Sequence, residues 1–167
     1  MPKPERPVQL SIIDRLIDER TADTVDVPTT RAQSVARLKA SVLRDLSMLL
    51  NTRLVIEEEE AEEAVYPELR QSLHHYGLRD ETALEGGAVA ARARLVRRIE
   101  DAVRLFEPRL TAVRVFVVEP DDAVGALEFR FVIEAILTMD PEPERVVFDA
   151  VRDSMNGGFR VAGDGHA

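Results

Sequence analysis

The chain changes its hydrophobic period at one point, the segment Glu107-Pro108-Arg109. Before this segment, two long runs carry apolar residues three and four positions apart, which is the period of an α-helix. After it, apolar and polar residues alternate, which is the period of a strand with one buried face. Helices first and strands last predict an α+β fold, in which N-terminal helices pack on a C-terminal, mainly antiparallel sheet of about four strands.

Two long helices are predicted from stripes of apolar residues. The run 31–51 follows Thr30 and Gln33, which have the spacing of a capping box. The second run covers 91–107. Their stripes are Val35, Leu38, Val42, Leu46, Leu49 and Leu50 in the first, and Leu95, Ile99, Ala102, Val103 and Phe106 in the second. Between them, segment 66–78 is predicted as a short helix, with Pro67 in its first turn and Gly77 as its C-terminal cap.

Four strands are predicted after Pro108, because β-branched and aromatic residues alternate with polar ones. The predicted strands cover 111–119, 126–140, 145–153 and 159–163. Asn156-Gly157 predicts the hairpin turn before the last strand.

The length of 167 residues predicts one domain with flexible ends. We expect residues 1–28 to form an N-terminal segment with a short amphipathic helix and a linker. Residues 29–163 are expected to form a single domain, and 164–167 a flexible tail. The acidic run Glu57–Glu63 is predicted to be a solvated surface, because like charges repel each other, and no role is assigned to it.

Composition argues against several classes of function. The net charge of -9 disfavours binding to nucleic acid or to an anionic membrane. The absence of cysteine excludes disulfides, thiolate metal sites and a cysteine nucleophile. We read no signal peptide and no membrane-spanning helix, so we expect a cytoplasmic protein without membrane insertion.

No motif predicts catalysis, a metal or a cofactor. The acidic residues form no recognisable glycosidase pair. His74 and His75 are adjacent, so on a helix they point in different directions and do not have metal-ligand spacing. The paired glycines lack the lysine and the strand-loop-helix setting of a phosphate-binding loop.

The N-terminal segment carries Ile12, Ile13, Leu16 and Ile17 at helical spacing. Two interpretations stay open for this short apolar cluster. It either docks on the core of the same chain or serves as a recognition segment for another protein.

Glu107-Pro108-Arg109 also supports two interpretations. Proline disfavours helical geometry in the preceding residue, so the helix should end at Phe106 or Glu107, and the charges would then be solvated. Alternatively, Glu107 and Arg109 lie two apart in a stiff segment and form a paired acceptor and donor that grips a partner.

The order of several segments resembles the TssE family, the baseplate wedge subunit of type VI secretion systems. This family is related to the sheath-initiating wedge protein of contractile phage tails. The resemblance covers nearly the whole folded chain, and its most specific motif is Glu107-Pro108-Arg109 between a helix and a strand. The segments that carry it are LSIIDRLIDE, SVLRDLSMLLNTR, YPELRQSLHHYGLRD, IEDAVRLFEPRLTAVRV, FRFVIEAIL and VVFDAVRD. EEEEAEE and EGGAVAARAR match no family signature.

The resemblance implies a non-enzymatic structural subunit. It implies that Glu107, Pro108 and Arg109 help to hold the wedge proteins TssF and TssG, with TssK as a further partner. It also implies that the sheet offers strands as the first template for the TssB–TssC sheath, at a baseplate on the cytoplasmic side of the inner membrane. The alternatives are a lysozyme-like peptidoglycan hydrolase, which needs two opposed carboxylates in a cleft, and an acidic adaptor that docks through its N-terminal helix.

Overall fold

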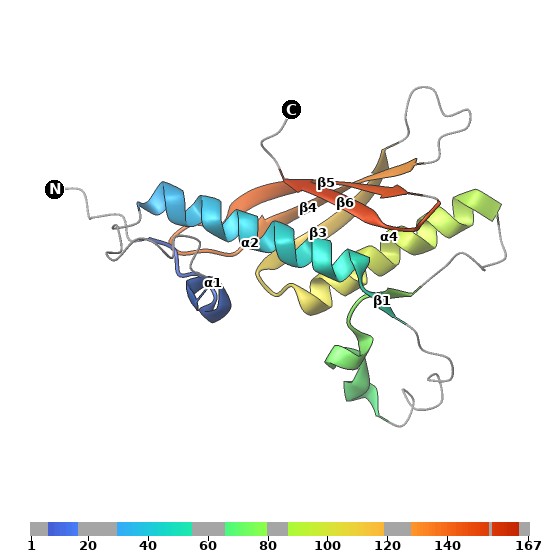
Figure 1. Cartoon of the computed structure of the whole chain (residues 1–167), viewed down its shortest axis with the longest axis horizontal. Helices are drawn as coiled ribbons and strands as arrows, with labels where there is room; N and C mark the ends of the chain where they lie inside the picture. Colours follow the sequence, from blue (N-terminus) through green and yellow to red (C-terminus); the bar gives the residue numbers. More distant parts are fainter. Residues whose placement is uncertain are drawn as a thin grey trace.

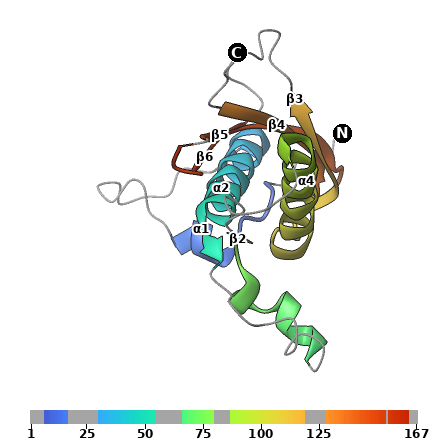
Figure 2. The same ribbon diagram turned by 90° about the vertical axis from the view of Figure 1, so that its right-hand side faces the viewer.

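The computed structural model describes residues 7–16, 30–54, 66–79, 87–118, 128–153 and 155–163. Helices α2 and α4 lie on one face of a four-stranded antiparallel sheet, as Figures 1 and 2 show, so the predicted α+β architecture is confirmed. The acidic run Glu57–Glu63, the linker before Thr30, Ile17 and the tail 164–167 lie outside the described residues.

The N-terminal half contains the short helix α1 (Ile12–Leu16) and the long helix α2 (Arg31–Asn51). Thr30 accepts a hydrogen bond from the Gln33 amide, and the Gln33 side chain accepts one from the Thr30 amide. These reciprocal bonds form the predicted capping box, and α2 ends at the predicted residue.

The segment predicted as one short helix is instead two 3₁₀ helices, η1 (Pro67–Gln71) and η2 (Leu73–His75). A short strand β2 (Leu78–Arg79) follows and pairs in parallel with β1 (Arg53–Leu54). Gly77 permits this approach, because its φ is +119° and an added Cβ would lie 2.4 Å from the Thr52 carbonyl oxygen. Tyr76 then packs edge-on against Phe106, with ring centroids 5.3 Å apart.

Helix α4 (Gly87–Phe106) begins four residues before the predicted start, so Gly87 does not break it. Its predicted core positions Leu95, Ile99, Ala102 and Val103 are buried, and Phe106 is partly buried against the core. No helix in the described part of the chain is long and apolar enough to cross a membrane.

The sheet contains β3 (Leu110–Val118), β4 (Glu128–Leu137), β5 (Glu144–Asp153) and β6 (Phe159–Gly163), in that spatial order. Each neighbouring pair is antiparallel. A register shift lies between Thr111 and Arg114 of β3, where Ala112 has a φ of 51°. This irregularity is a β-bulge, and it directly follows the Glu107-Pro108-Arg109 segment.

The core lies between the helices and the inner face of the sheet. Alternate residues of β4 and β5 point inward, as the alternation predicts. The buried members of this layer include Phe131, Ile133, Leu137, Val146 and Phe148 from the sheet and Val42, Leu46, Ile99 and Val103 from the helices.

Candidate functional site at the helix-to-strand junction

Helix α4 ends at Phe106, and strand β3 begins at Leu110 after a tight turn. The Glu107 amide donates to the Val103 carbonyl at 2.9 Å, and the Leu110 amide donates to the Glu107 carbonyl at 3.0 Å. Pro108 is exposed at the tip of this turn. Because proline fixes its own φ and donates no hydrogen bond, it ends the helix and stiffens the turn.

Glu107 and Arg109 bond to each other, as predicted, but they do so on the inner side of the turn. Arg109 Nε donates to Glu107 Oε1 at 2.6 Å, and Arg109 Nη2 bonds to Glu107 Oε2. Glu107 is only 3% exposed, and the Arg109 side chain is 24% exposed. The expectation of solvated charges is therefore wrong, because a buried carboxylate requires this bidentate partner.

Arg109 also reaches helix α2. Its Nη2 donates to Asp45 Oδ2 at 2.6 Å, and its Nη1 donates to Ser41 Oγ at 2.9 Å. Hydrogen bonds to Glu107 raise the pKa of Arg109, and Asp45 raises it further. Arg109 thus remains charged and joins α2 to the junction between α4 and β3.

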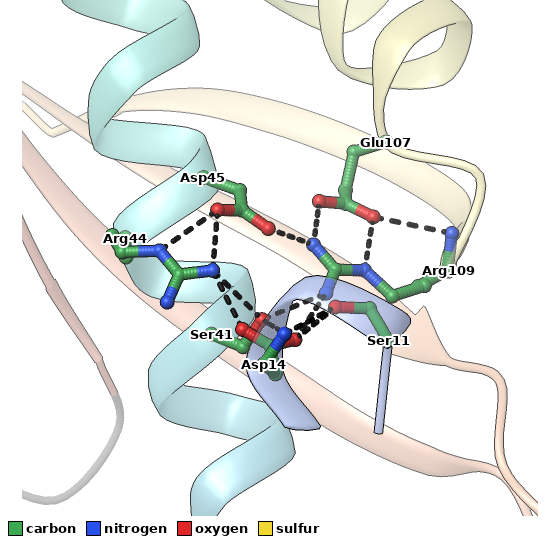
Figure 3. Close-up of polar contacts among 7 residues, drawn as sticks. All are labelled: Ser11, Asp14, Ser41, Arg44, Asp45, Glu107 and Arg109. Carbon is green, nitrogen blue, oxygen red and sulfur yellow. Dashed lines mark hydrogen bonds and ion pairs between the residues drawn. The ribbon is translucent and has the colours of Figure 1, made fainter. Parts of the chain in front are cut away.

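A second arginine extends these contacts to α1 (Figure 3). Arg44 donates to Asp45 at 3.1 Å and to Asp14 at 2.7 Å. Asp14 Oδ2 also accepts from Ser11 Oγ at 2.5 Å and from Ser41 Oγ at 2.7 Å. Burial alone would raise the pKa of Asp14, but these hydrogen bonds lower it to about 2.

We call these seven residues the junction cluster: Ser11, Asp14, Ser41, Arg44, Asp45, Glu107 and Arg109. It contains three carboxylates and two guanidinium groups. Each arginine lies between two carboxylates, so the buried charges are paired rather than isolated.

The N-terminal segment is held by this cluster and by contacts just before α1. Val8 and Leu10 pack against the core, and the Val8 amide donates to Ser34 Oγ at 2.9 Å. Because Asp14 turns toward α2, the polar side of α1 faces the domain. The segment therefore docks through Val8, Leu10 and Asp14. The interpretation that the apolar cluster itself docks on the core is wrong for its described members, which are exposed.

The apolar side of α1 is exposed. Ile12, Ile13 and Leu16 are 74%, 68% and 77% exposed, and Ile17 lies outside the described residues. Three large apolar side chains on one short helix form a surface that water solvates poorly. We call Ile12, Ile13 and Leu16 the α1 apolar surface.

Partner contact at Glu107, Pro108 and Arg109 stays a prediction. Pro108 and part of Arg109 are accessible, whereas the Glu107 carboxylate is enclosed and orients Arg109. Sequence reasoning missed Asp14, Ser41 and Asp45. The sequence did contain one sign of this site. Ser34 and Ser41 fall at the same helical spacing as the apolar residues Leu38 and Val42, and so lie on the buried side of α2.

A groove of about 590 Å³ lies between α4 and the β1–β2 pair, and it borders the junction at Phe106. Among the described residues that line it, Asp101 supplies the one carboxylate. A hydrolase that cleaves a glycosidic bond by acid and base needs two carboxylates, so the described lining of this groove lacks that arrangement.

The comparisons agree with the resemblance seen in the sequence. A family model described as baseplate wedge protein gp25 matches residues 36–142, which is more than half of the chain. The match includes most of α2, the Glu107-Pro108-Arg109 segment and strands β3 and β4. No curated protein matches the chain. The chain belongs to the family of the baseplate wedge protein gp25, in which TssE is the type VI secretion member.

Proposed function

We propose that this chain is the TssE-type wedge subunit of a type VI secretion baseplate, on the cytoplasmic side of the inner membrane. The observation that carries the proposal is the family match, which covers the junction segment, helix α4 and most of α2. In this role the chain binds TssF and TssG, with TssK as a further neighbour, and its sheet templates the TssB–TssC sheath by strand addition.

The described contacts support a rigid docking role. The junction cluster holds three segments that are distant in the sequence, namely α1, α2 and the α4–β3 turn. Binding to such a surface costs little conformational entropy, because this chain already holds the surface in place before the partner arrives. The α1 apolar surface and the accessible part of Arg109 are the contacts that we assign to TssF and TssG.

The proposal includes the absence of enzymatic activity. A lysozyme-like hydrolase needs one carboxylic acid with a raised pKa. Asp14 instead has a lowered pKa, and Asp45 and Glu107 both accept hydrogen bonds from Arg109. These carboxylates are engaged in holding the fold together, which favours the structural role over the hydrolase alternative.

The test is capture of TssF and TssG by the tagged full-length chain from cells that produce the secretion system. The variant Ile12→Ser/Ile13→Ser/Leu16→Ser removes the α1 apolar surface and leaves the junction cluster intact. We expect it to retain much less TssF and TssG than the wild type.

A matched control is Leu73→Ser/Met155→Ser, which removes two apolar side chains that are each 83% exposed elsewhere. It should capture both proteins normally. Equal capture by the α1 variant and the wild type would refute the role of this surface. Failure of the folded wild type to capture either protein would refute the proposed function.

A further inference from the structure

The sheet has two edge strands, β3 and β6, and their main-chain groups determine where another strand can add. In an antiparallel pair, alternate residues turn their amide and carbonyl groups away from the neighbouring strand. In β3, the main-chain groups of Val113 and Val115 point away from β4, because the Val113 carbonyl and the Val115 amide bond to α4. By the same alternation, the amide and carbonyl of Val117 also point away from β4. In β6, the main-chain groups of Phe159, Val161 and Gly163 point away from β5.

The β3 edge is covered by two side chains of α4. Arg104 Nη2 donates to the Val113 carbonyl at 2.9 Å, and the Val115 amide donates to Glu100 Oε1 at 2.9 Å. Arg104 and Glu100 also bond to each other at 3.1 Å. An incoming strand needs the same carbonyl and amide in the middle of β3, so this pair of side chains blocks strand addition there.

Among the described residues, the β6 edge is covered only at its beginning. Asn51 Nδ2 donates to the Phe159 carbonyl at 2.9 Å, and the Phe159 amide donates to Asn51 Oδ1 at 2.8 Å. The Asn51 amide thus occupies the place of one residue in a neighbouring strand. Within the described part of the chain, the outward groups of Val161 and Gly163 have no hydrogen-bond partner.

We infer that β6 is the edge that accepts a strand from another chain, and that pairing begins at Val161 because Asn51 occupies Phe159. This inference rests on the proposed function and assigns the added strand to a sheath subunit. A second copy of this chain is disfavoured as the occupant, because each copy carries a net charge of -9 and like-charged chains repel. Main-chain hydrogen bonds supply the contact, so no deep pocket is required.

The test compares two proline variants of the full-length chain, Val161→Pro and Val117→Pro. Both positions lie on edge strands, both amides face outward and both side chains are partly buried against the core. Proline therefore removes no bond of the existing ladders in either variant, but it blocks an added strand at its own edge. Circular dichroism should show that both variants fold.

The assay measures the amount of TssB–TssC pair that each purified tagged variant retains. We expect Val161→Pro to retain about tenfold less than the wild type, the loss expected when a strand cannot pair at that residue. Val117→Pro should match the wild type. Loss with Val117→Pro and not with Val161→Pro would overturn the inference in favour of β3 while leaving the proposed function standing.

Hydrogen exchange gives a second readout that needs no substitution. In the complex of wild-type chain with TssB–TssC, the Val161 and Gly163 amides should exchange about tenfold more slowly, whereas the Val117 amide should not change. Equal exchange at β6 with and without the sheath pair would overturn the inference. Slowing at β6 in the chain alone as its concentration rises would also overturn it, since a second copy would then be the occupant. No retention by any form, wild type included, would overturn both the inference and the sheath-templating function.

Discussion

The guanidinium of Arg109 bonds to Glu107, Asp45 and Ser41, so one side chain joins two helices and the strand that follows them. The spacing of Glu107 and Arg109 predicted their pairing, because residues two apart in an extended segment point the same way. It did not predict that the pair turns inward. That direction depends on Asp45 and Ser41, which lie more than 60 residues earlier in the chain.

Replacing Arg109 with Ala should destabilise the fold strongly. The change leaves the buried Glu107 carboxylate without its partner, and breaking a buried pair costs about 3 kcal/mol or more. The matched control is Arg145→Ala, which removes an exposed pair with Glu134 and should cost less than about 1 kcal/mol. Urea unfolding monitored by circular dichroism measures both values. Equal free energies of unfolding for the two variants would contradict the buried pair.

Asp14 makes the docking of α1 sensitive to acid. Its pKa is lowered from 3.8 to about 2, so the fold favours the charged carboxylate. The stabilisation is complete above about pH 4 and is lost as the pH falls through about 2. The free energy of unfolding of Asp14→Asn should therefore lie about 2 kcal/mol below that of the wild type at pH 6, and the difference should shrink as the pH approaches 2.

The control for this prediction is Asp101→Asn, because the Asp101 side chain is 76% exposed. The free energy of unfolding of this variant should differ little from that of the wild type, both at pH 6 and near pH 2. A difference for Asp14→Asn that stays constant from pH 6 to pH 2 would show that the lowered pKa is not the cause.

The long elements follow from the period of their apolar residues. Helix α2 and strands β3 to β6 appear where the sequence predicts them, because each buries one continuous face. The segment 66–79 does not fold as predicted, since its few apolar residues form no continuous stripe and its shape is set by contacts with α2 and α4. Tyr76 packs on Phe106, and the Leu78 amide donates to the Thr52 carbonyl, and both contacts are distant in the sequence.

Gly77→Ala tests that segment. The added Cβ would meet the Thr52 carbonyl oxygen at 2.4 Å, so the β1–β2 pair must separate. Gly157→Ala is the matched control, because Gly157 also has a positive φ but its nearest neighbours lie 3.5 Å away. Both variants lose about 1–2 kcal/mol from the left-handed backbone alone. Thermal unfolding should show a distinctly larger loss for Gly77→Ala, and equal losses would contradict the close approach.

Glu100 and Arg104 of α4 protect main-chain groups at the β3 edge, and removing the two side chains should expose those groups. Glu100→Ala/Arg104→Ala leaves the Val113 carbonyl and the Val115 amide without these partners. Hydrogen exchange at the Val115 amide should therefore be about tenfold faster than in the wild type, because one hydrogen bond is lost. Asp101→Ala, which leaves the Glu100–Arg104 pair in place, should exchange at the wild-type rate. An unchanged rate at Val115 in the double variant would show that something else protects this edge.

Across the whole molecule, local sequence patterns determine some of the structure and tertiary contacts determine the rest. The four-stranded sheet and its two covering helices are predictable from local patterns, whereas the position of α1 is not. Asp14 reaches Ser41 and Arg44 across about 30 residues, so the exposure of Ile12, Ile13 and Leu16 depends on tertiary contacts. In its described part the molecule therefore combines a rigid junction, a helix with an exposed apolar side and the β6 edge, whose outward groups are unpaired at Val161 and Gly163. This combination suits a subunit that contacts several partners at once.

Sheath assembly in living cells tests the central claim most directly. The gene for this chain would be deleted from cells whose TssB carries a fluorescent label, and the number and length of sheaths would be counted with and without restored wild-type protein. We predict that extended sheaths disappear on deletion and return with the wild-type chain. Sheaths of normal number and length in the deleted cells would contradict a role in initiating the sheath at the baseplate.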